Sequence, residues 1–306
     1  MNIKTAQFHA LLIDRIRQLS TPLEPRPTPI PARLPRLKGI RAVLFDVYGT
    51  LFISGSGDIS IAGELSNQDA LTEALESVGM RGNLQEAGQT GIREFFAVID
   101  AAHAKRRQEG IATPEVDVRE EWTTVVRQLQ QTGLLRGTIT QDAIARLGVE
   151  YECRVNPVWP MPDVAETLNA LKARPFRLGI VSNAQFHTPL LFPALLGASL
   201  PELGVRQDLC VWSYQLLEAK PSVNLFQGVI ARLQQHDDIS PAEIIYVGND
   251  MLNDIWPATQ LGLKTAFFAG DQRSLRLRKD DPRCASLEPD VIITRLSQLP
   301  DLLDTV

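Results

Sequence analysis

The chain has 306 residues, 44% of them hydrophobic, and its 31 basic and 36 acidic side chains give a net charge of −5. A chain of this length and hydrophobic content can form one large core and a smaller second one. Its negative net charge argues against a surface built to bind the nucleic-acid backbone. The sequence contains no apolar run long enough to cross a bilayer. The cysteines lie far apart without CxxC spacing, which predicts a reducing, cytoplasmic compartment: Cys153, Cys210 and Cys284.

Residues 1–39 are predicted to form an N-terminal arm with two parts. Phe8, Leu12 and Ile16 recur at helical spacing, which predicts an amphipathic helix over 3–20. The segment that follows holds six prolines in residues 22–35, and it must be extended because proline lacks the N–H that a helix or a central strand needs. We expect the arm to pack on its own domain, with a homodimer contact or a weak membrane-surface anchor as alternatives.

From Ile40 onward, short apolar runs alternate with helical patterns. The runs are IRAVLFD (40–46), FRLGIVS (176–182), EIIYVGN (243–249), KTAFFAG (264–270) and DVIIT (290–294), and the helical patterns are 164–173, 222–235 and 253–262. This alternation predicts an α/β fold with a doubly wound parallel sheet. Its core spans residues 40–59 and 158–306, and ligands bind beyond the carboxyl ends of its strands.

The block between the first two strands, residues 60–157, is predicted to be a smaller, all-helical domain. Its stretches 68–80, 89–110 and 118–135 are amphipathic, with no clear strand among them. An insertion at this point stands over the ligand-binding edge of the sheet. Its two joints are expected near 54–58 and 156–162, which are rich in Gly/Ser and in Pro.

Four separated motifs follow the ends of these elements: FDVYGTL (45–51), IVSNA (180–184), EAKPS (218–222) and YVGNDMLNDI (246–255). In this order they resemble the haloacid dehalogenase-like hydrolase superfamily, whose core is a Rossmann-like sheet and whose cap domain is inserted after the first strand. The resemblance extends from about Ile40 to the end of the chain. It implies a hydrolase that acts on a small molecule through a covalent aspartyl intermediate.

Asp46 is the predicted nucleophile. A carboxylate at a strand end, beside a turn that Gly49 permits, is exposed enough to attack phosphorus or carbon and to form an ester that water then hydrolyses. A turn-forming aspartate is the structural alternative. Thr50, in the same turn, is assigned to substrate binding.

The second and third motifs supply groups that stabilise negative charge. The hydroxyl of Ser182 and the backbone N–H groups of Asn183 and Ala184 are predicted to hold phosphoryl or carboxylate oxygens, although Ser-Asn is also an ordinary helix N-cap. Lys220 precedes Pro221, which favours an extended backbone. There its ammonium would neutralise the nucleophile and stabilise the transition state.

The fourth motif departs from the pattern of the phosphatases in the superfamily. They place an aspartate directly after the glycine to hold Mg²⁺, whereas here Asn249 follows the glycine, with Asp250 and Asp254 beyond it. An asparagine offers a carbonyl oxygen without charge. The predicted Mg²⁺ ligands are these three residues, Asp46 and the backbone carbonyl of Tyr48; the alternative is that Asp250 caps a helix and Asp254 favours its first turn.

Tyr48 stands where these phosphatases carry a second aspartate that protonates the leaving group. A phenol with a pKa of about 10 is a weak base at pH 7, and tyrosine here is similar to the L-2-haloacid dehalogenases, whose halide needs no proton and which use no metal. They also need an arginine from the cap to receive the halide. The cap offers several, none of which can be chosen from sequence: Arg81, Arg93, Arg106 and Arg107.

Three hypotheses follow. The first is a Mg²⁺-dependent phosphatase acting on a small phosphorylated metabolite, with water or Tyr48 in place of the usual acid. The second is a metal-free 2-haloacid dehalogenase that uses Asp46, and the third is a binding protein that has lost catalysis. The loop 270–281 carries Arg273, Arg276 and Arg278; a solvated loop or a subunit contact is favoured over recognition of an acidic substrate group. His103 and His187 are expected to be structural. Nothing in 60–157 indicates the substrate.

Overall fold

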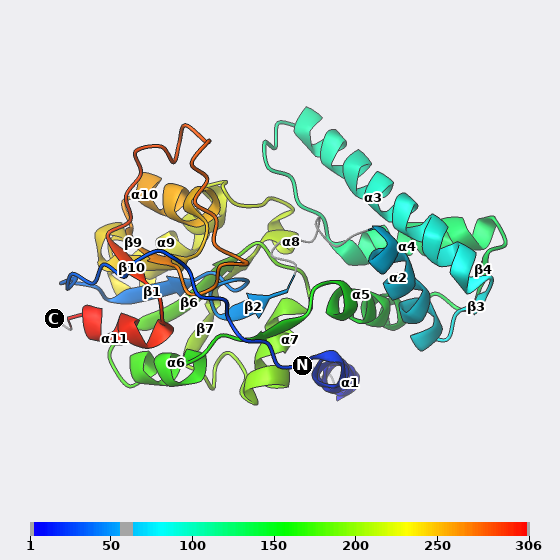
Figure 1. The fold of residues 1–306 in the computed structure, drawn as a ribbon, viewed down its shortest axis with the longest axis horizontal. Coiled ribbons are helices and arrows are strands. Elements are labelled where there is room, and N and C mark those ends of the chain that lie inside the picture. The colour runs from blue at the N-terminus through cyan, green and yellow to red at the C-terminus, as the bar shows by residue number, and fades with distance from the viewer. Residues whose placement is uncertain (1–2, 56–63, 305–306) are drawn as a thin grey trace.

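The computed structural model describes residues 3–55 and 64–304. Figure 1 shows two lobes, an α/β core and a smaller cap of long helices beside it. The core confirms the expected fold class: a six-stranded, all-parallel sheet of order β10-β9-β8-β1-β6-β7. Its strands are β1 Ala42–Phe45, β6 Arg177–Ser182, β7 Val205–Trp212, β8 Ile244–Gly248, β9 Lys264–Phe268 and β10 Val291–Ile293.

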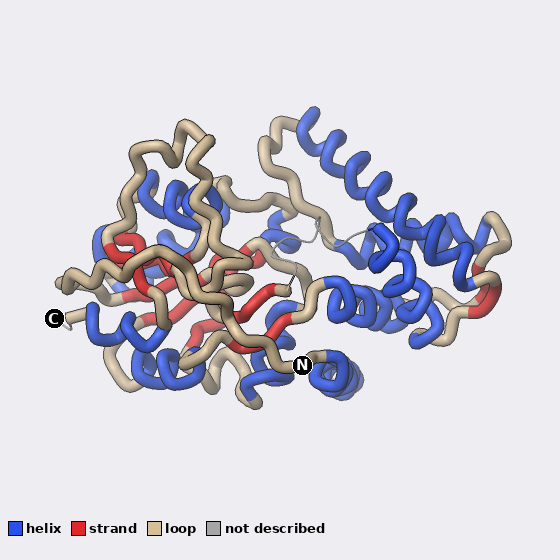
Figure 2. The backbone as a smooth tube through the Cα atoms, in the orientation of Figure 1, coloured by secondary structure: helices blue, strands red, loops and turns tan. Residues whose placement is uncertain are grey.

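Helices cover both faces of the sheet, as Figure 2 shows. They are α6 Val164–Lys172, α7 Thr188–Leu191, α8 Ser213–Leu216, α9 Asn224–Asp237, α10 Trp256–Gln260 and α11 Leu299–Leu302. Successive residues of a strand point to opposite faces. Val43 and Phe45 enter one apolar cluster, while Ala42 and Leu44 enter the cluster on the other side. Burial on both faces is the physical reason for the continuous apolar runs that predicted these strands.

The edge strand β7 was not expected from the sequence. Arg206, Gln207 and Asp208 interrupt its apolar pattern, and two of these side chains are exposed. An edge strand has a neighbour on one side only, so it needs no continuous apolar run. Period and composition therefore did not distinguish it from a loop.

The cap holds four helices, α2 Glu64–Ser77, α3 Leu84–Gln108, α4 Val118–Gln131 and α5 Gln141–Val155. Three of them were expected, and α5 was not. The expectation of an all-helical cap was wrong in one respect, because β3 Arg81–Gly82 and β4 Leu135–Arg136 form a short antiparallel ribbon. A separate apolar cluster fills the cap, in which the rings of Phe95 and Trp122 stack at 3.8 Å between centroids.

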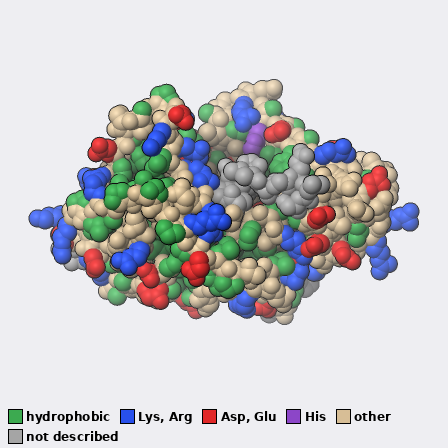
Figure 3. Space-filling view, in the orientation of Figure 1, with side chains coloured by type: hydrophobic (Ala, Val, Ile, Leu, Met, Phe, Trp, Pro, Cys, Tyr) green, Lys and Arg blue, Asp and Glu red, His purple; other side chains and the backbone are tan. Residues whose placement is uncertain are grey.

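The chain enters and leaves the cap at one place. There β2 Phe52–Ser54 pairs antiparallel with β5 Val158–Pro160. Strand β5 lies within the second predicted joint, 156–162, whereas β2 ends at Ser54, where the first predicted joint begins; residues 56–63 lie outside the described part of the chain. On the face drawn in Figure 3, basic and acidic side chains are interspersed over both lobes. In the described ranges no helix is both long and apolar enough to traverse a bilayer.

The proline-rich segment packs on its own domain, as expected. Arg33 exchanges two backbone hydrogen bonds with Ile292 of β10, at 2.8 and 2.9 Å, and the Leu37 N–H donates to the Leu302 carbonyl at 2.7 Å. The segment thereby covers the open edge of the sheet at β10, where unpaired backbone groups would otherwise face solvent or a second chain.

Helix α1, Ile3–Leu19, connects the cap to the core. Its Arg15 donates through Nε to Glu150 Oε1 of α5, and Arg17 donates to the Ala194 carbonyl of the core at 3.1 Å. Glu150 is 1% exposed and also pairs with Arg154 at 2.6 Å. Burial alone would raise the pKa of Glu150, but the hydrogen bonds from Arg15 and Arg154 outweigh it and lower that pKa.

We expect Glu150→Gln to lower the free energy of unfolding by about 2 kcal/mol at pH 7, because it leaves two arginines without their shared carboxylate. The folded-state pKa of Glu150 is below its unfolded value, so this contribution is present above about pH 4.5 and is lost as the pH falls below it. Urea unfolding at pH 7 and pH 4 measures the effect. Glu73→Gln removes an exposed partner of Arg154 and serves as control, with an expected loss under about 0.5 kcal/mol; equal losses for the two variants would contradict the assignment.

Candidate active site

Asp46 directly follows β1, at the carboxyl end of the central strand. Its N–H donates to the Val247 carbonyl at 2.9 Å, and its side chain is nearly buried. Gly49 makes the next turn with φ +81°, and a Cβ on it would lie 2.6 Å from Asn249 Nδ2 and 2.5 Å from Ser274 Cβ. Only glycine fits there, because both the backbone conformation and the space exclude a side chain.

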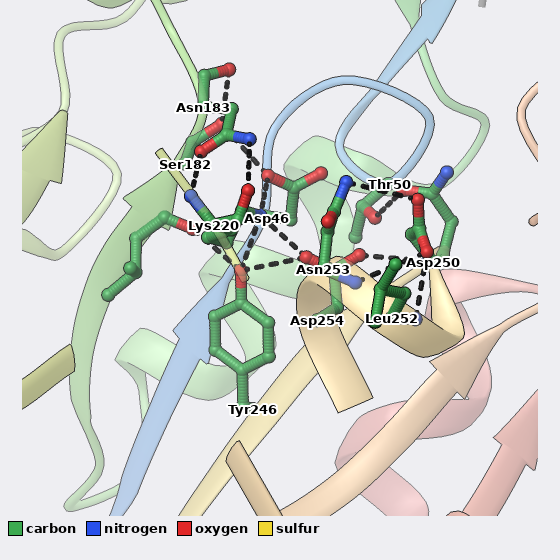
Figure 4. Close-up of polar contacts among 12 residues, drawn as sticks. Asp46, Thr50, Ser182, Asn183, Lys220, Tyr246, Asp250, Leu252, Asn253 and Asp254 are labelled. Atoms are coloured by element: carbon green, nitrogen blue, oxygen red, sulfur yellow. Dashed lines mark hydrogen bonds and ion pairs between the residues drawn. The ribbon is translucent and has the colours of Figure 1, made fainter. Parts of the chain in front are cut away.

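Lys220 joins two carboxylates from separate strand ends (Figure 4). Its Nζ lies 2.7 Å from Asp46 Oδ1, 2.5 Å from Asp254 Oδ1 and 3.0 Å from the Tyr246 hydroxyl. Burial alone would lower the pKa of Lys220, but the charges of Asp254 and Asp46 outweigh it and raise that pKa. The lysine therefore stays charged at neutral pH and offsets the charge of the predicted nucleophile, as expected from sequence.

Asp254 is the second carboxylate on Lys220 and is 1% exposed. Burial raises its pKa, and the charges of Asp46 and Asp250 add to that effect, whereas Lys220 opposes it. Its other oxygen accepts the N–H of Asp250 at 2.9 Å. Two buried carboxylates thus share a single ammonium group, whose positive charge offsets both.

Ser182 ends β6 and donates from Oγ to Asp46 Oδ1 at 2.9 Å. The side chain of Asn183 accepts the N–H of Lys220 at 2.7 Å and so fixes the loop that carries the lysine. The Ala184 N–H donates to Ser213 Oγ at 2.9 Å, and this serine in turn donates to Glu115 of the cap. Of the predicted anion cradle, Ser182 is directed at Asp46, while the Ala184 N–H is engaged within the protein.

The geometry gives a reason for the asparagine in the fourth motif. Asn249 Nδ2 donates to the Ser274 carbonyl at 2.6 Å, and Asn249 Oδ1 accepts from the Thr50 hydroxyl at 3.0 Å. An aspartate could accept from Thr50 but would set a negative oxygen against the Ser274 carbonyl. Thr50, assigned to substrate binding from sequence, is directed at Asn249 in this structure.

Asp250 caps a helix, which was the alternative to metal binding given in the sequence analysis. Its Oδ1 accepts the N–H groups of Leu252 and Asn253, at 2.9 and 3.2 Å. Arg278 pairs with its other oxygen at 2.6 Å. The side chain is thus fully used by backbone donors and an arginine.

The oxygen atoms near Asp46 are of the kind that binds Mg²⁺, but fewer of them belong to charged carboxylates than the sequence predicted. In the described part of the chain, the side-chain hydrogen bonds to Asp46 all reach Oδ1 and leave Oδ2 for another partner. No group of three acidic, histidine or cysteine side chains suited to a metal forms within residues 3–55 and 64–304. A hard cation here would depend on Asp46, Asp254, the Asn249 amide oxygen and the Tyr48 carbonyl.

Tyr48 lies partly buried beside the nucleophile. Its hydroxyl is 2.9 Å from Thr188 Oγ1. Burial raises the pKa of this hydroxyl above its usual value, and the charge of Glu152 raises it further. The Tyr48 hydroxyl therefore holds its proton more firmly than that of an exposed tyrosine and is a poor proton donor at neutral pH.

A cavity of about 500 Å³ lies over these groups, between core and cap. Asp46, Tyr48 and Lys220 line it from the core, and Trp122, Tyr151 and Glu152 line it from the cap. Arg276 and Arg278 also line it, which agrees with the less favoured interpretation of their loop. His103 and His187 face the cavity too, although a structural role was expected for both.

Two residues of the candidate site were missed by sequence reasoning. Tyr246 lies in the apolar run of β8, and its hydroxyl bonds Lys220 and the Val181 carbonyl; a polar tip inside a buried strand was a signal for it. Glu152 lies on α5, a helix that was not expected, so no signal pointed to it.

Comparison with known proteins agrees with this geometry. The family model described as "haloacid dehalogenase-like hydrolase" matches residues 40–262. The chain belongs to this family. The match covers the cap, all four motifs and the core as far as residue 262, and it confirms the resemblance seen in the sequence.

Individual relatives include enzymes of both chemistries. A ribulose-1,5-bisphosphate 5-phosphatase of Halopiger xanaduensis is 28% identical over 268 residues, which are 86% of this chain and 98% of that protein. The solved 2-haloacid dehalogenase of Pseudomonas syringae is 18% identical, with a TM-score of 0.52 over 86% of this chain and 97% of its own. The structural likeness confirms the fold, and the family makes the chain a hydrolase.

We expect Asn249→Asp to lower the free energy of unfolding by about 1–3 kcal/mol, because the buried Ser274 carbonyl loses its donor and faces a negative oxygen. Thermal or urea unfolding measures the change. Asn169→Asp, on the exposed face of α6, is the control and should change stability by less than about 0.5 kcal/mol. A variant as stable as the parent would show that the Asn249–Ser274 contact does not require an amide.

Proposed function

We propose that this hydrolase is a Mg²⁺-dependent phosphomonoesterase that acts on a small phosphorylated metabolite. The observation that carries the proposal is the cavity, because Asp46 shares about 500 Å³ with Lys220, Arg276 and Arg278. This volume lies in the range of metabolite pockets and exceeds what a 2-haloacid of a few atoms would fill. Three cations around one nucleophile suit a phosphorylated substrate.

In this reaction Asp46 attacks phosphorus and forms an aspartyl phosphate, which water then hydrolyses. Lys220 holds Asp46 Oδ1 at 2.7 Å and reduces the repulsion between the carboxylate and the phosphoryl oxygens. Ser182 holds the same oxygen at 2.9 Å and fixes the orientation of the carboxylate. The nucleophile is thus oriented before the substrate arrives.

Mg²⁺ would be held by Asp46, Asp254, the Asn249 amide oxygen and the Tyr48 carbonyl, directly or through water. When bound, it supplies charge that neutralises the phosphoryl oxygens as they approach the carboxylates. Asp250 takes no direct part in this set, because its oxygens hold a helix N-terminus and Arg278.

The relative from Halopiger supports the phosphatase reading and suggests a substrate class. It is named as a phosphatase of a sugar bisphosphate, and two arginines that line the cavity suit a substrate with a second anionic group. We therefore include ribulose-1,5-bisphosphate among the substrates to be tested.

A second candidate remains a metal-free 2-haloacid dehalogenase. Tyr48 favours it, because its hydroxyl bonds Thr188 and is a poor proton donor, and a departing halide needs no proton. Against it, none of the four cap arginines predicted as halide ligands is among the described residues that line the cavity.

We expect the purified protein to release inorganic phosphate from one or more members of a panel of sugar phosphates and bisphosphates with Mg²⁺ present. EDTA should abolish the release, and Asp46→Asn should reduce kcat by at least about 10³-fold, because it removes the nucleophile. Phosphate release measured with and without metal tests this directly.

Halide release from 2-chloropropionate is the counter-test. Metal-independent halide release, with no phosphate release from the panel, would replace the proposal by the dehalogenase hypothesis. Absence of both activities would leave the hypothesis of a binding protein.

We expect Arg276→Met to raise KM for a bisphosphate about tenfold while changing KM for the matching monophosphate less than about threefold. The reason is loss of one charge-assisted contact to the second anionic group. Arg283→Met, an exposed arginine following the same loop, is the control. Equal changes for both substrates would remove Arg276 from substrate recognition.

A further inference from the structure

Departure of an alkoxide from phosphorus needs a proton, and the groups closest to Asp46 are poor donors of one. Lys220 is tied between two carboxylates that raise its pKa. The Tyr48 hydroxyl also has a raised pKa and shares its hydrogen bond with Thr188. A general acid works best when its pKa lies near the working pH, so the proton must come from another group in the cavity.

Several acidic side chains besides Asp46 line the cavity: Asp100, Glu115, Glu152, Asp250 and Asp254. Asp250 and Asp254 are paired with Arg278 and Lys220. Glu115 accepts from the Val116 N–H and the Ser213 hydroxyl, both at 2.9 Å. Asp250, Asp254 and Glu115 therefore act as hydrogen-bond or ion-pair acceptors in this structure, which leaves Asp100 and Glu152.

Asp100 lies on an exposed face of α3, where solvent competes for its proton.

Glu152 differs from the other four acidic side chains of the cavity. Its hydrogen bond comes from the neutral Asn156 amide at 3.1 Å, and no cation pairs with it in residues 3–55 and 64–304. It is the acid of the cavity best able to carry a proton at neutral pH.

The position of Glu152 is fixed by helix α5, the cap helix nearest the core in Figure 1. Gly148, Glu152 and Asn156 recur every four residues and line the cavity together. A Cβ on Gly148 would lie 3.2 Å from the Phe186 ring of the core, so glycine allows the close approach of the helix. Asn156 Oδ1 accepts from Ser54 of β2 at 2.8 Å, which anchors the amide that holds Glu152.

Charge and burial agree with this placement. Burial raises the pKa of Glu152 to about 7, while the Asn156 hydrogen bond opposes the rise. The charge of Glu152 also acts on the Tyr48 hydroxyl more strongly than the charge of Asp46 does. Glu152 therefore lies near Tyr48, the residue that stands where phosphatases of this family carry their acid.

We propose that Glu152, supplied by the cap, is the general acid and general base of the reaction. Asp46 forms a bond to phosphorus as the bond to the leaving oxygen breaks, and that oxygen takes the proton of Glu152. The Glu152 carboxylate then takes a proton from the water that attacks phosphorus. The bond from phosphorus to Asp46 breaks, which releases inorganic phosphate and restores both carboxyl groups.

This assignment rests on the proposed phosphatase function, and dependence on the leaving group tests it. For the full-length enzyme with Mg²⁺, we compare p-nitrophenyl phosphate, whose phenolate leaves without a proton, with an alkyl phosphate that the enzyme hydrolyses. Glu152→Gln should lower kcat/KM for the alkyl phosphate by about 10²–10⁴-fold and for the aryl phosphate by less than about tenfold. It should lower kcat for both, because hydrolysis of the aspartyl phosphate needs the base.

Two further variants complete the experiment. Asp142→Asn, an exposed acid on the same helix, should leave both substrates unaffected. Glu152→Asp keeps the acid on a shorter side chain and should recover part of the alkyl activity; if Glu152→Gln does not fold, Glu152→Asp serves in its place, with at least about tenfold loss expected for the alkyl phosphate alone.

The outcomes separate the two proposals. Equal losses of kcat/KM for both substrates, or no loss for either, would overturn the role of Glu152 while the parent enzyme still releases phosphate. Failure of the parent enzyme to hydrolyse any phosphate ester would overturn the proposed function, and the role of Glu152 with it.

Discussion

The buried ammonium group of Lys220 lies between Asp46 and Asp254, and the arrangement of the site depends on it. Asp46 follows β1 and Asp254 lies in the helical turn after the adjacent strand β8, so two buried carboxylates of like charge face each other there. Lys220 offsets both, at 2.7 and 2.5 Å. The three groups come from segments around positions 46, 220 and 254, so the ion pairs also fix three loops relative to one another.

The loop that carries Lys220 is held from both sides. Asn183 of the core accepts its N–H. In Ala219, the preceding residue, the N–H donates to the Thr113 carbonyl of the cap and the carbonyl accepts from the Thr113 hydroxyl. Glu115 continues this contact to Ser213. The cap is therefore part of the structure that positions the lysine, in addition to closing the cavity above it.

Helix α1 adds a second connection between the lobes through Arg15 and Glu150. Glu150 and Glu152 lie two positions apart on α5 and have opposite environments. Glu150 faces two arginines that lower its pKa, while Glu152 faces the cavity and a neutral amide, and burial raises its pKa. One helix thus provides a structural carboxylate on one side and a titratable one on the other.

Sequence alone indicated five of the six core strands, the place of the cap insertion and the family, and it singled out Asp46 as the predicted nucleophile, because continuous apolar runs and residues at strand ends are local patterns. It did not determine α5, β7, Tyr246 or Glu152. Their roles arise from which segments meet in space, and an edge strand or a cap helix has no distinctive period. The contacts of Asn249 and Asp250 were likewise decided by the neighbours that folding brings to them, Ser274 and Arg278.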